Sequence, residues 1–185
     1  MSEAAKDAPK RAGIWLWLPL ALFAGFFVLV MVGLLRPADR EVASAFVGKP
    51  LPAFDLRPAI PDRPGLKTAD MTGKPRLLNV FASWCIPCAA EAPQLAALAA
   101  QGVEIDGVAI RDRPEDVQAF LARYGNPFAR IGADDVSAVQ LAIGSSGVPE
   151  TFVIDGKGVI RHQHIGDIRA EDLSTILDKL REAGR

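Results

Sequence analysis

Residues 77–93 read LLNVFASWCIPCAAEAP, and they contain both cysteines of the 185-residue chain, Cys85 and Cys88. The apolar run Arg76–Ala82 predicts a central buried strand, and the alanine-rich run Pro87–Ala100 predicts a helix. Cys85 therefore falls where a buried strand ends and a helix begins. The N–H groups of the first helical turn and the helix dipole favour a thiolate at such a place. Cys88, one turn further on, can close a small disulfide ring with it.

The composition suits one ordinary domain with an appendage. Hydrophobic residues make up 50% of the chain and the formal net charge is −1, so the chain can bury a core and lacks the basic excess of a nucleic-acid binder. Two cysteines are too few for a disulfide framework or a four-thiolate zinc site. We expect no cofactor, no bound metal and no nucleic-acid partner.

Residues 14–35 form an uncharged run of 22 residues, long enough to cross the roughly 30 Å hydrocarbon layer of a membrane. Three basic residues precede this run and two follow it closely. We therefore predict a cytoplasmic N-terminus at 1–13, a transmembrane anchor at 14–35, a tether at 36–50 and an exported domain at 51–185. A cleaved signal peptide is the alternative, because Ala43–Ala45 resembles a cleavage site, but the apolar core of a signal peptide has typically about 7–15 residues.

The exported part alternates strands and helices, which predicts an α/β sandwich. In addition to the strand and helix around the cysteines, strands are expected at 53–56, 103–110, 151–155 and 159–165, the last two as a hairpin. Helices are expected at 114–124, from Asp134 or Asp135 to Ile143, and around 173–180.

The cysteine pair fits redox chemistry better than two other interpretations. Such a pair exchanges disulfides: Cys85 attacks a partner's disulfide, a mixed disulfide forms, and Cys88 resolves it. Half of a zinc site would need two further ligands, and only His162 and His164 are available. These histidines alternate along a predicted strand and share a face, which also fits solvent-facing polar residues. Two inert core cysteines would be an odd choice in a domain exported to an oxidising compartment.

The motifs resemble a known family. Trp84–Cys88 (WCIPC) after a buried strand and Gly147–Pro149 before another strand resemble the thioredoxin fold. More narrowly, LLNVFASWCIPCAAEAP together with GVPETFVID resembles the CcmG/DsbE family of membrane-tethered thiol:disulfide oxidoreductases of cytochrome c maturation. The lead-in VGKPLPAFDL fits the start of that family, and the likeness covers about residues 46–182. It implies a thioredoxin-like fold, with a central mixed β-sheet flanked by helices, behind an N-terminal transmembrane helix.

The resemblance also implies roles for individual residues. Cys85 would be the exposed nucleophile and Cys88 the buried resolving thiol of a redox disulfide. The Val148–Pro149 bond would be a cis peptide beside this disulfide, and the backbone of Val148 would pair with an extended substrate strand. Trp84 would pack over the rim of the active site, with an ordinary core tryptophan as the alternative.

One position departs from thioredoxin itself. Thioredoxins commonly have a buried aspartate, used in proton transfer to the resolving cysteine, at the strand position that Asn79 holds here; the CcmG/DsbE pattern also has asparagine there. Asparagine cannot take a proton, yet Cys88 must lose one before it attacks. Our hypothesis is that Glu91, three residues after Cys88, or Glu150, directly after Pro149, acts as the base. The alternative is that both are solvated surface charges.

The resemblance implies a reductant that keeps the haem-attachment cysteines of apocytochrome c, or a haem-lyase-type maturation partner, in the dithiol state. Electrons would come from a transmembrane thiol reductant, and the chain would lie in the bacterial inner membrane with its catalytic domain in the periplasm. Two alternatives remain open. The same chemistry could serve copper-site cysteines in oxidase assembly or form disulfides, or the chain could be a non-enzymatic copper chaperone that uses Cys85, Cys88 and a histidine.

Overall fold

The computed structural model describes residues 13–35 and 45–185. The chain divides into two units, Met1–Val42 and Ala43–Arg185, and the second contains the sheet, the cysteines and all the predicted site residues. The predicted cytoplasmic N-terminus and most of the predicted tether lie outside the described residues.

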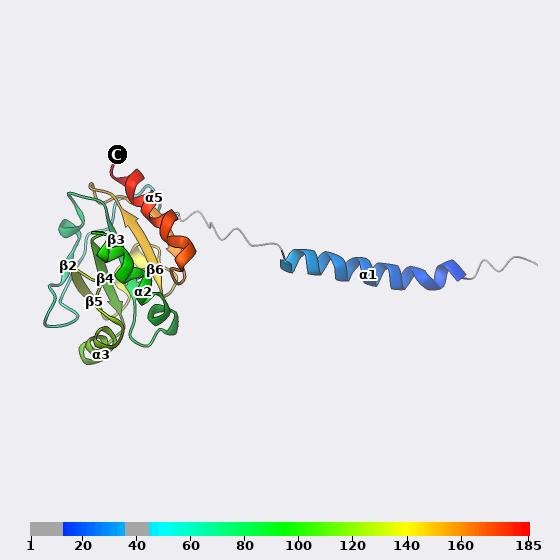
Figure 1. Cartoon of the computed structure of the whole chain (residues 1–185), viewed down its shortest axis with the longest axis horizontal. Helices are drawn as coiled ribbons and strands as arrows, with labels where there is room; N and C mark the ends of the chain where they lie inside the picture. The colour runs from blue at the N-terminus through cyan, green and yellow to red at the C-terminus, as the bar shows by residue number, and fades with distance from the viewer. Residues whose placement is uncertain (1–12, 36–44) are drawn as a thin grey trace, which may run out of the picture. The chain divides into compact units, whose positions relative to one another are not determined.

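The first unit contains one helix, α1, which spans Gly13–Leu35 and includes Pro19 (Figure 1). Its side chains are described from residue 17 to residue 33. Within the part of the chain that is described, no helix is long and apolar enough to cross a membrane. The anchor at 14–35 therefore stays a prediction.

A five-stranded mixed sheet forms the centre of the second unit, in the order β5-β4-β3-β6-β7. Its strands are β3 (Arg76–Phe81), β4 (Ile105–Ile110), β5 (Arg130–Asp134), β6 (Glu150–Ile154) and β7 (Ile160–Ile165). β3, β4 and β5 run parallel, whereas β6 runs antiparallel to β3 and β7 antiparallel to β6. Every residue of β3 is buried, because this strand has neighbours on both sides and helices on its faces. The expected central strand, the mixed sheet and the hairpin are confirmed.

Helices flank the sheet. They are α2 (Ile86–Ala100), α3 (Pro114–Tyr124), α4 (Ala138–Ala142) and α5 (Leu173–Ala183). Figure 1 shows α2, in green, and α5, in red, in front of the sheet; α2 packs against α3, and α5 packs against β6 and β7. Pro114 occupies the first turn of α3 and Gly125 follows its last residue, so both predicted boundaries are confirmed.

Shorter elements cover the edges of the sheet. They are β1 (Asp55–Leu56), β2 (Leu66–Lys67), and the 3-10 turns η1 (Thr68–Met71) and η2 (Ala170–Asp172). β1 and β2 pair antiparallel, and the segment beside them bridges to β5 through Pro58 and Gly132. The strand expected at 53–56 is therefore reduced to its last two residues.

β5 was not expected from the sequence, which predicts that Asp134 or Asp135 caps a short helix through Ile143. Asp134 instead ends β5, and its carboxylate accepts hydrogen bonds from the N–H groups of Ala138 and Gln140, both at 2.8 Å, at the start of α4. The helix thus begins only at Ala138, with Ser137 as its N-cap residue, and of the two candidate caps Asp134 is the one that accepts hydrogen bonds from its first turn. The sequence of β5 does not read as a strand because Gly132 lies in its middle and glycine is a poor strand former. A side chain there would meet Leu56, since a Cβ would lie 2.7 Å from it.

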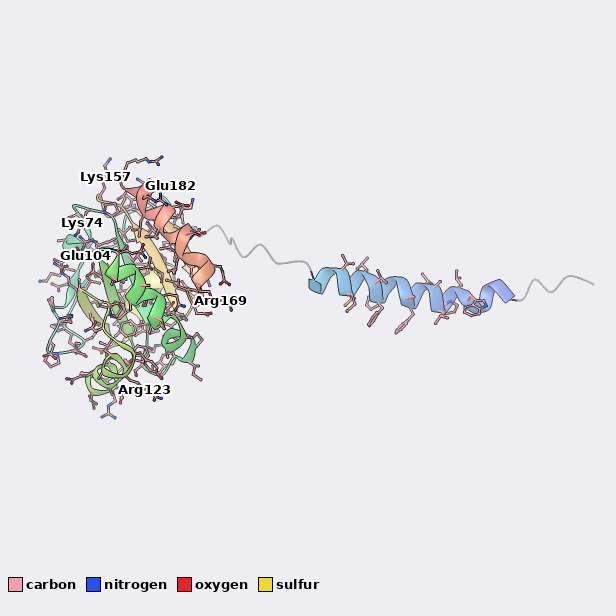
Figure 2. All side chains as sticks on the ribbon, in the orientation of Figure 1. Lys74, Glu104, Arg123, Lys157, Arg169 and Glu182 are labelled. Carbon is pink, nitrogen blue, oxygen red and sulfur yellow. A yellow bond between two sulfur atoms is a disulfide. The ribbon has the colours of Figure 1, made fainter. Side chains whose placement is uncertain are left out.

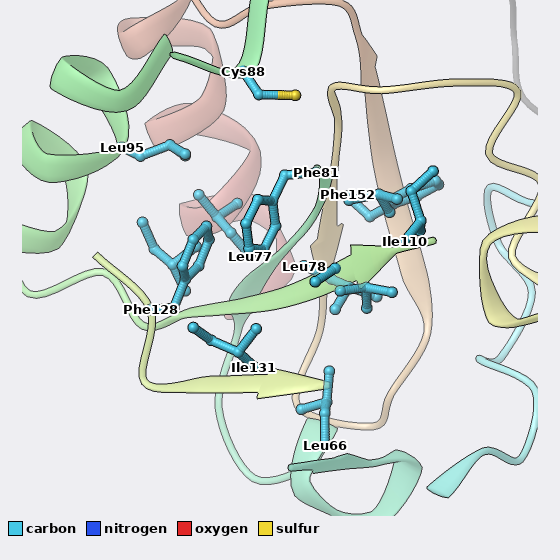
Figure 3. Close-up of a cluster of buried hydrophobic side chains, with 14 of the residues drawn as sticks. Leu66, Leu77, Leu78, Phe81, Cys88, Leu95, Ile110, Phe128, Ile131 and Phe152 are labelled. Atoms are coloured by element: carbon cyan, nitrogen blue, oxygen red, sulfur yellow. The ribbon is translucent and has the colours of Figure 1, made fainter. Parts of the chain in front are cut away.

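The apolar core lies between the sheet and the helices (Figure 3). Phe81 stacks on Phe128 with ring centroids 4.7 Å apart, and Leu95 of α2 packs onto the same cluster. Figure 3 shows Cys88 at the margin of this cluster, above Phe81. The core therefore supports the base of the helix turn that carries the cysteines.

Buried charges lie at the opposite end of the sheet from the cysteines. Arg76, at the start of β3, donates to Glu104 at 2.5 Å and to Asp106 at 3.1 Å. Lys74 pairs with Glu104 at 2.7 Å; the labels of these two residues lie next to each other in Figure 2. The Lys74 hydrogen bond lowers the pKa of Glu104, whereas burial raises the pKa of Asp106 despite Arg76 and Arg130 beside it. This network holds the far ends of β3 and β4 together.

Candidate active site

The two cysteines form a disulfide at the start of α2. The sulfurs are 2.15 Å apart and the Cα atoms 5.3 Å apart. Cys85 is the N-cap residue of the helix, and its Sγ accepts a hydrogen bond from the backbone N–H of Cys88 at 3.1 Å. After reduction, the same donor and the helix dipole stabilise a negative charge on Cys85. The strand–helix junction expected from the sequence is confirmed.

Cys85 is less exposed than the resemblance implies. Its residue exposure is 5%, against 2% for Cys88, so both count as buried and Cys85 is only slightly more accessible. The physical reason is that the N-cap turn and the bond to Cys88 direct the Cys85 sulfur towards the helix. The residues on either side point outward instead: Trp84 is 59% exposed and Ile86 is 83% exposed. The reading of Trp84 as a core tryptophan is therefore wrong.

Asp112 fixes the end of the strand that leads into the cysteines. Its carboxylate accepts hydrogen bonds from the backbone N–H of Ser83 at 2.5 Å and from the Ser83 hydroxyl at 2.7 Å. Asp112 follows β4, which is parallel to β3, so the carboxyl ends of the two strands meet at one edge. The sequence reasoning missed this residue. Its signal was a carboxylate directly beyond the end of a predicted strand.

The Val148–Pro149 bond is a cis peptide, as the resemblance implies. Because Glu150 begins β6 and pairs with Val80, this peptide lies at the same edge of the sheet as the cysteines. The side chain of Val148 is half-buried and Pro149 is buried. No hydrogen bond joins the backbone N–H or C=O of Val148 to another group in residues 45–185.

Glu150 braces the loop that leads to the cis peptide. Its Oε1 accepts from the N–H of Ser146 at 2.9 Å, the hydroxyl of Ser146 at 2.7 Å and the N–H of Gly147 at 3.2 Å. Its Oε2 accepts from Gln163 on β7 at 2.6 Å. Glu150 is 1% exposed, so its reading as a solvated surface charge is wrong. Its hydrogen bonds give it a structural task.

Glu91 is fully buried on α2, on the helix face that carries Cys88. Its Oε1 accepts from Asn79 Nδ2 at 2.9 Å and its Oε2 accepts from the N–H of Ile168 at 3.0 Å. Burial raises the pKa of Glu91 to about 7; the bonds from Ile168 and Asn79 oppose this rise, and the charge of Asp167 adds to it. The surface-charge reading is wrong for Glu91 too.

A small cavity joins Glu91 to the resolving cysteine. Its volume is about 10 Å³, and Asn79, Cys88 and Glu91 line it together with apolar side chains. Of the two candidate bases, Glu91 therefore faces the same cavity as Cys88. A carboxyl with a pKa near neutrality can take up and release a proton at the pH where thiol exchange operates.

Comparison with known proteins agrees with this geometry. The Redoxin family model matches residues 46–180. The thiol:disulfide interchange protein HelX of Rhodobacter capsulatus is 37% identical over 165 residues, which cover 89% of this chain and 94% of that protein. The thiol:disulfide interchange protein DsbE of Pseudomonas fluorescens is 44% identical over 156 residues, which cover 83% and 86%. The chain belongs to the DsbE family of redoxins.

A solved structure shows the same fold. The thiol:disulfide interchange protein, a thioredoxin family protein, of Chlorobium tepidum superposes with a TM-score of 0.57 over 71% of this chain and 94% of that one, at 24% identity. The thioredoxin-like fold is thereby confirmed. Membership in the DsbE family, together with the Cys85–Cys88 pair, makes this protein a thiol:disulfide interchange enzyme.

Exposed apolar side chains lie at the edge of the sheet that carries the DsbE-family disulfide. Trp84 and Ile86 follow β3, and Val136 and Leu141, which are 74% and 65% exposed, follow β5. Because β3, β4 and β5 are parallel, these residues lie at one edge of the sheet. They are the four most exposed large apolar side chains of residues 45–185. We call them the apolar rim.

A groove of about 530 Å³ adjoins the apolar rim. Trp84 forms one wall, and Arg111 and Tyr124 lie further along it. Arg111 adopts a left-handed backbone conformation, with φ of 46°, directly after β4. The groove beside Trp84 therefore combines apolar groups with charges of both signs, including Asp112 and Asp116, which suits contact with another protein.

The two histidines of this DsbE-family protein lie on β7 and are half-buried. His164 Nε2 is 3.3 Å from the backbone carbonyl of Asp167. Among the described residues, no three His, Cys, Asp or Glu side chains are grouped so that they could hold a metal ion. The residues that the structure brings together with the cysteines are Asn79, Glu91 and the Val148–Pro149 peptide.

Proposed function

We propose that this protein is a membrane-anchored reductase that reduces disulfides of apocytochrome c, or of a haem-lyase-type maturation partner, during c-type cytochrome biogenesis. The observation that carries the proposal is the disulfide at the N-terminus of α2, beside a cis-proline and inside an apolar rim. The match to proteins named DsbE and HelX supports the same class of target.

The reaction uses both sulfurs. In the reduced protein, the Cys85 thiolate attacks one sulfur of the partner's disulfide, and the partner's other sulfur leaves as a thiolate. Cys88 then loses its proton and attacks Cys85. The Cys85–Cys88 bond forms as the bond from Cys85 to the partner breaks, so two electrons have passed to the partner. A transmembrane thiol reductant returns two electrons to the protein. The hydrogen bond from the Cys88 N–H supports Cys85 as the first nucleophile.

Glu91 is proposed as the base that accepts the proton of Cys88. Its position in the shared cavity and its pKa of about 7 support this role. Glu150 is assigned a different task. Three of its hydrogen bonds hold the loop before Pro149 and the fourth ties it to Gln163 on β7, so it positions the cis peptide and does not exchange protons with Cys88.

The partner docks at the apolar rim in an extended conformation. The backbone N–H and C=O of Val148, which make no hydrogen bond within residues 45–185, can pair with the backbone of a partner residue next to the partner's cysteine. The partner then adds a short strand. Trp84 and Ile86 cover the partner's side chains next to the disulfide. This arrangement recognises backbone and apolar surface near a cysteine.

The anchor and the compartment are part of the proposal. The 22-residue uncharged run at 14–35 supports an inner-membrane anchor with the N-terminus in the cytoplasm and residues 51–185 in the periplasm. Partners confined to the same membrane meet the tethered domain at a higher effective concentration than free partners would.

A trapping experiment tests the target. A Cys88→Ala variant of the full chain cannot resolve the mixed disulfide, so its partner should stay bound to Cys85. We expect cytochrome c maturation proteins among the trapped species, and a Cys85→Ser, Cys88→Ala double variant should trap none. Recovery of oxidase-assembly proteins alone would show that the targets are copper-site cysteines. Copper bound to the protein, without any trapped partner, would show that the protein is a copper carrier and not a reductase.

A further inference from the structure

The side-chain amide of Asn79 is buried next to the resolving cysteine and is only half satisfied. Its Nδ2 donates to Glu91 Oε1 and to Thr151 Oγ1, both at 2.9 Å. Because an ionised carboxylate can only accept, the bond to Glu91 in its charged form requires the nitrogen at this end of the amide. Its Oδ1 accepts no hydrogen bond from any group in the described part of the chain. A buried acceptor left unpaired is unfavourable, so this oxygen calls for a partner.

The cavity beside Asn79 supplies the room for that partner. Its volume of about 10 Å³ is close to the roughly 10–15 Å³ that one water molecule needs on this measure. A buried water also needs two to four polar partners. Asn79, Cys88 and Glu91 provide three on the cavity wall, and the rest of the wall is largely apolar. Volume and polarity therefore both fit a single water.

We propose that this cavity binds one water molecule that carries the proton of Cys88 to Glu91, and that Asn79 is the positioning residue for this transfer. The water donates one hydrogen to Asn79 Oδ1 and the other to the Glu91 carboxylate, and its oxygen accepts the S–H of Cys88. Asn79 thus holds the carboxylate with its nitrogen and the water with its oxygen. This inference rests on the proposed function, because it specifies the Glu91 step.

The step balances without another reactant. The S–H bond of Cys88 breaks, its proton passes to the water, and one proton of the water passes to Glu91. The electron pair on the Cys88 sulfur forms the bond to Cys85. The electron pair of the bond between Cys85 and the partner stays on the partner's sulfur, which leaves as a thiolate. Asn79 neither gains nor loses a proton in this step. An amide is therefore sufficient at position 79, because Glu91 accepts the proton.

An amide at position 79 also sets the titration of Glu91. Two hydrogen bonds lower the pKa of Glu91 against the effect of burial: one from Asn79 on β3 and one from the N–H of Ile168, in the segment before η2. The nearby charge of Asp167 raises this pKa. Without the Asn79 donor, the pKa of Glu91 rises further, because that hydrogen bond favours the charged form. An aspartate at 79 would place a second carboxylate against Glu91, and two such groups cannot both ionise easily.

The test uses the reduced full-length protein in detergent, mixed with an aromatic nitrobenzoate disulfide. The first coloured thiolate released reports the attack by Cys85, and the second reports resolution by Cys88. Asn79→Leu is close in shape and lacks both polar atoms. It should slow the second release by about tenfold or more, the loss expected for one hydrogen bond to a charged group. The pH midpoint of that release should move upward, and the first release should be unchanged.

Two further variants make the test specific. Asn79→Asp keeps an acceptor for the water but removes the donor to Glu91, so it should raise the pH midpoint of the second release even if its maximal rate survives. Asp106→Asn changes a buried polar residue at the far end of the sheet and should leave both profiles unchanged. A general loss of stability therefore cannot imitate the expected result.

The outcomes separate this inference from the proposed function. If Glu91→Gln slows the second release and Asn79→Leu changes neither its rate nor its midpoint, Asn79 does not position the transfer, and the proposed function stands. If neither variant slows it, the role of Glu91 fails together with this inference. A crystal structure of the reduced wild-type protein gives an independent check. We expect one ordered water within hydrogen-bond distance of Asn79 Oδ1; an empty cavity at high resolution would overturn the proposal.

Discussion

Replacing Glu91 by glutamine should stabilise the folded protein, and the gain should depend on pH. Glu91 is fully buried, and its ionised form loses hydration that two hydrogen bonds restore only in part. Glutamine keeps the shape and an acceptor oxygen but carries no charge. The substitution therefore removes the unfavourable burial of a carboxylate while it leaves the packing of α2 in place.

The size of the effect follows from the pKa. Burial raises the pKa of Glu91 from 4.5 to about 7. Below about pH 4.5 the carboxyl is protonated in both the folded and the unfolded chain, and stability is unaffected. As the pH rises the unfolded chain ionises first, so the wild type loses stability until both states are ionised above about pH 7. At about 1.4 kcal/mol for each pKa unit, the total loss is about 3 kcal/mol.

The measurement is urea denaturation of the oxidised full-length chain in detergent, followed by circular dichroism across the pH range. The free energy of unfolding of Glu91→Gln should equal that of the wild type below about pH 4.5 and exceed it by about 3 kcal/mol above about pH 7. Glu171→Gln, which changes an exposed glutamate, is the matched control and should follow the wild type throughout. A gain that is the same at every pH, or a loss that grows towards alkaline pH, would refute the reasoning.

Three other substitutions test the framework of the site. Asp112→Ala removes both hydrogen bonds to Ser83 and should lower the free energy of unfolding by about 2 kcal/mol, measured by urea denaturation. Glu150→Gln should loosen residues 145–147, seen as faster amide hydrogen exchange there, because its carboxylate holds that loop. Gly132→Ala should destabilise the fold by about 1–3 kcal/mol in urea without changing the disulfide exchange rate, because the added carbon would overlap packed side chains far from the cysteines.

The elements that could be predicted from the sequence are those whose signal is local. The apolar run of β3 and the proline and glycine at the ends of α3 are patterns within a few residues. β5 could not be predicted in the same way. Its middle residue, Gly132, is set by contact with Leu56, which is far away in the chain. The contact with Leu56 requires a glycine in the middle of β5, so the strand lacks the run of β-branched or aromatic residues from which a strand is predicted.

The same distinction applies to the site. The spacing of Cys85 and Cys88 predicts a disulfide at a helix start, and the structure has it. The sequence could propose Glu91 and Glu150 as bases but could not separate them. Their tasks depend on which groups reach them from other elements: Ile168 in one case, Gln163 in the other.

Glu91 is hard to explain by stability alone. A glutamine at this position would avoid about 3 kcal/mol of destabilisation at neutral pH. The two hydrogen bonds of the carboxylate do not compensate fully, since its pKa remains raised. Its position is informative, however. The residue stands one helical turn from Cys88, faces the same cavity and titrates near neutrality, where a thiol must lose its proton to attack. A group that weakens the fold yet meets each requirement of a base is best explained by the reaction.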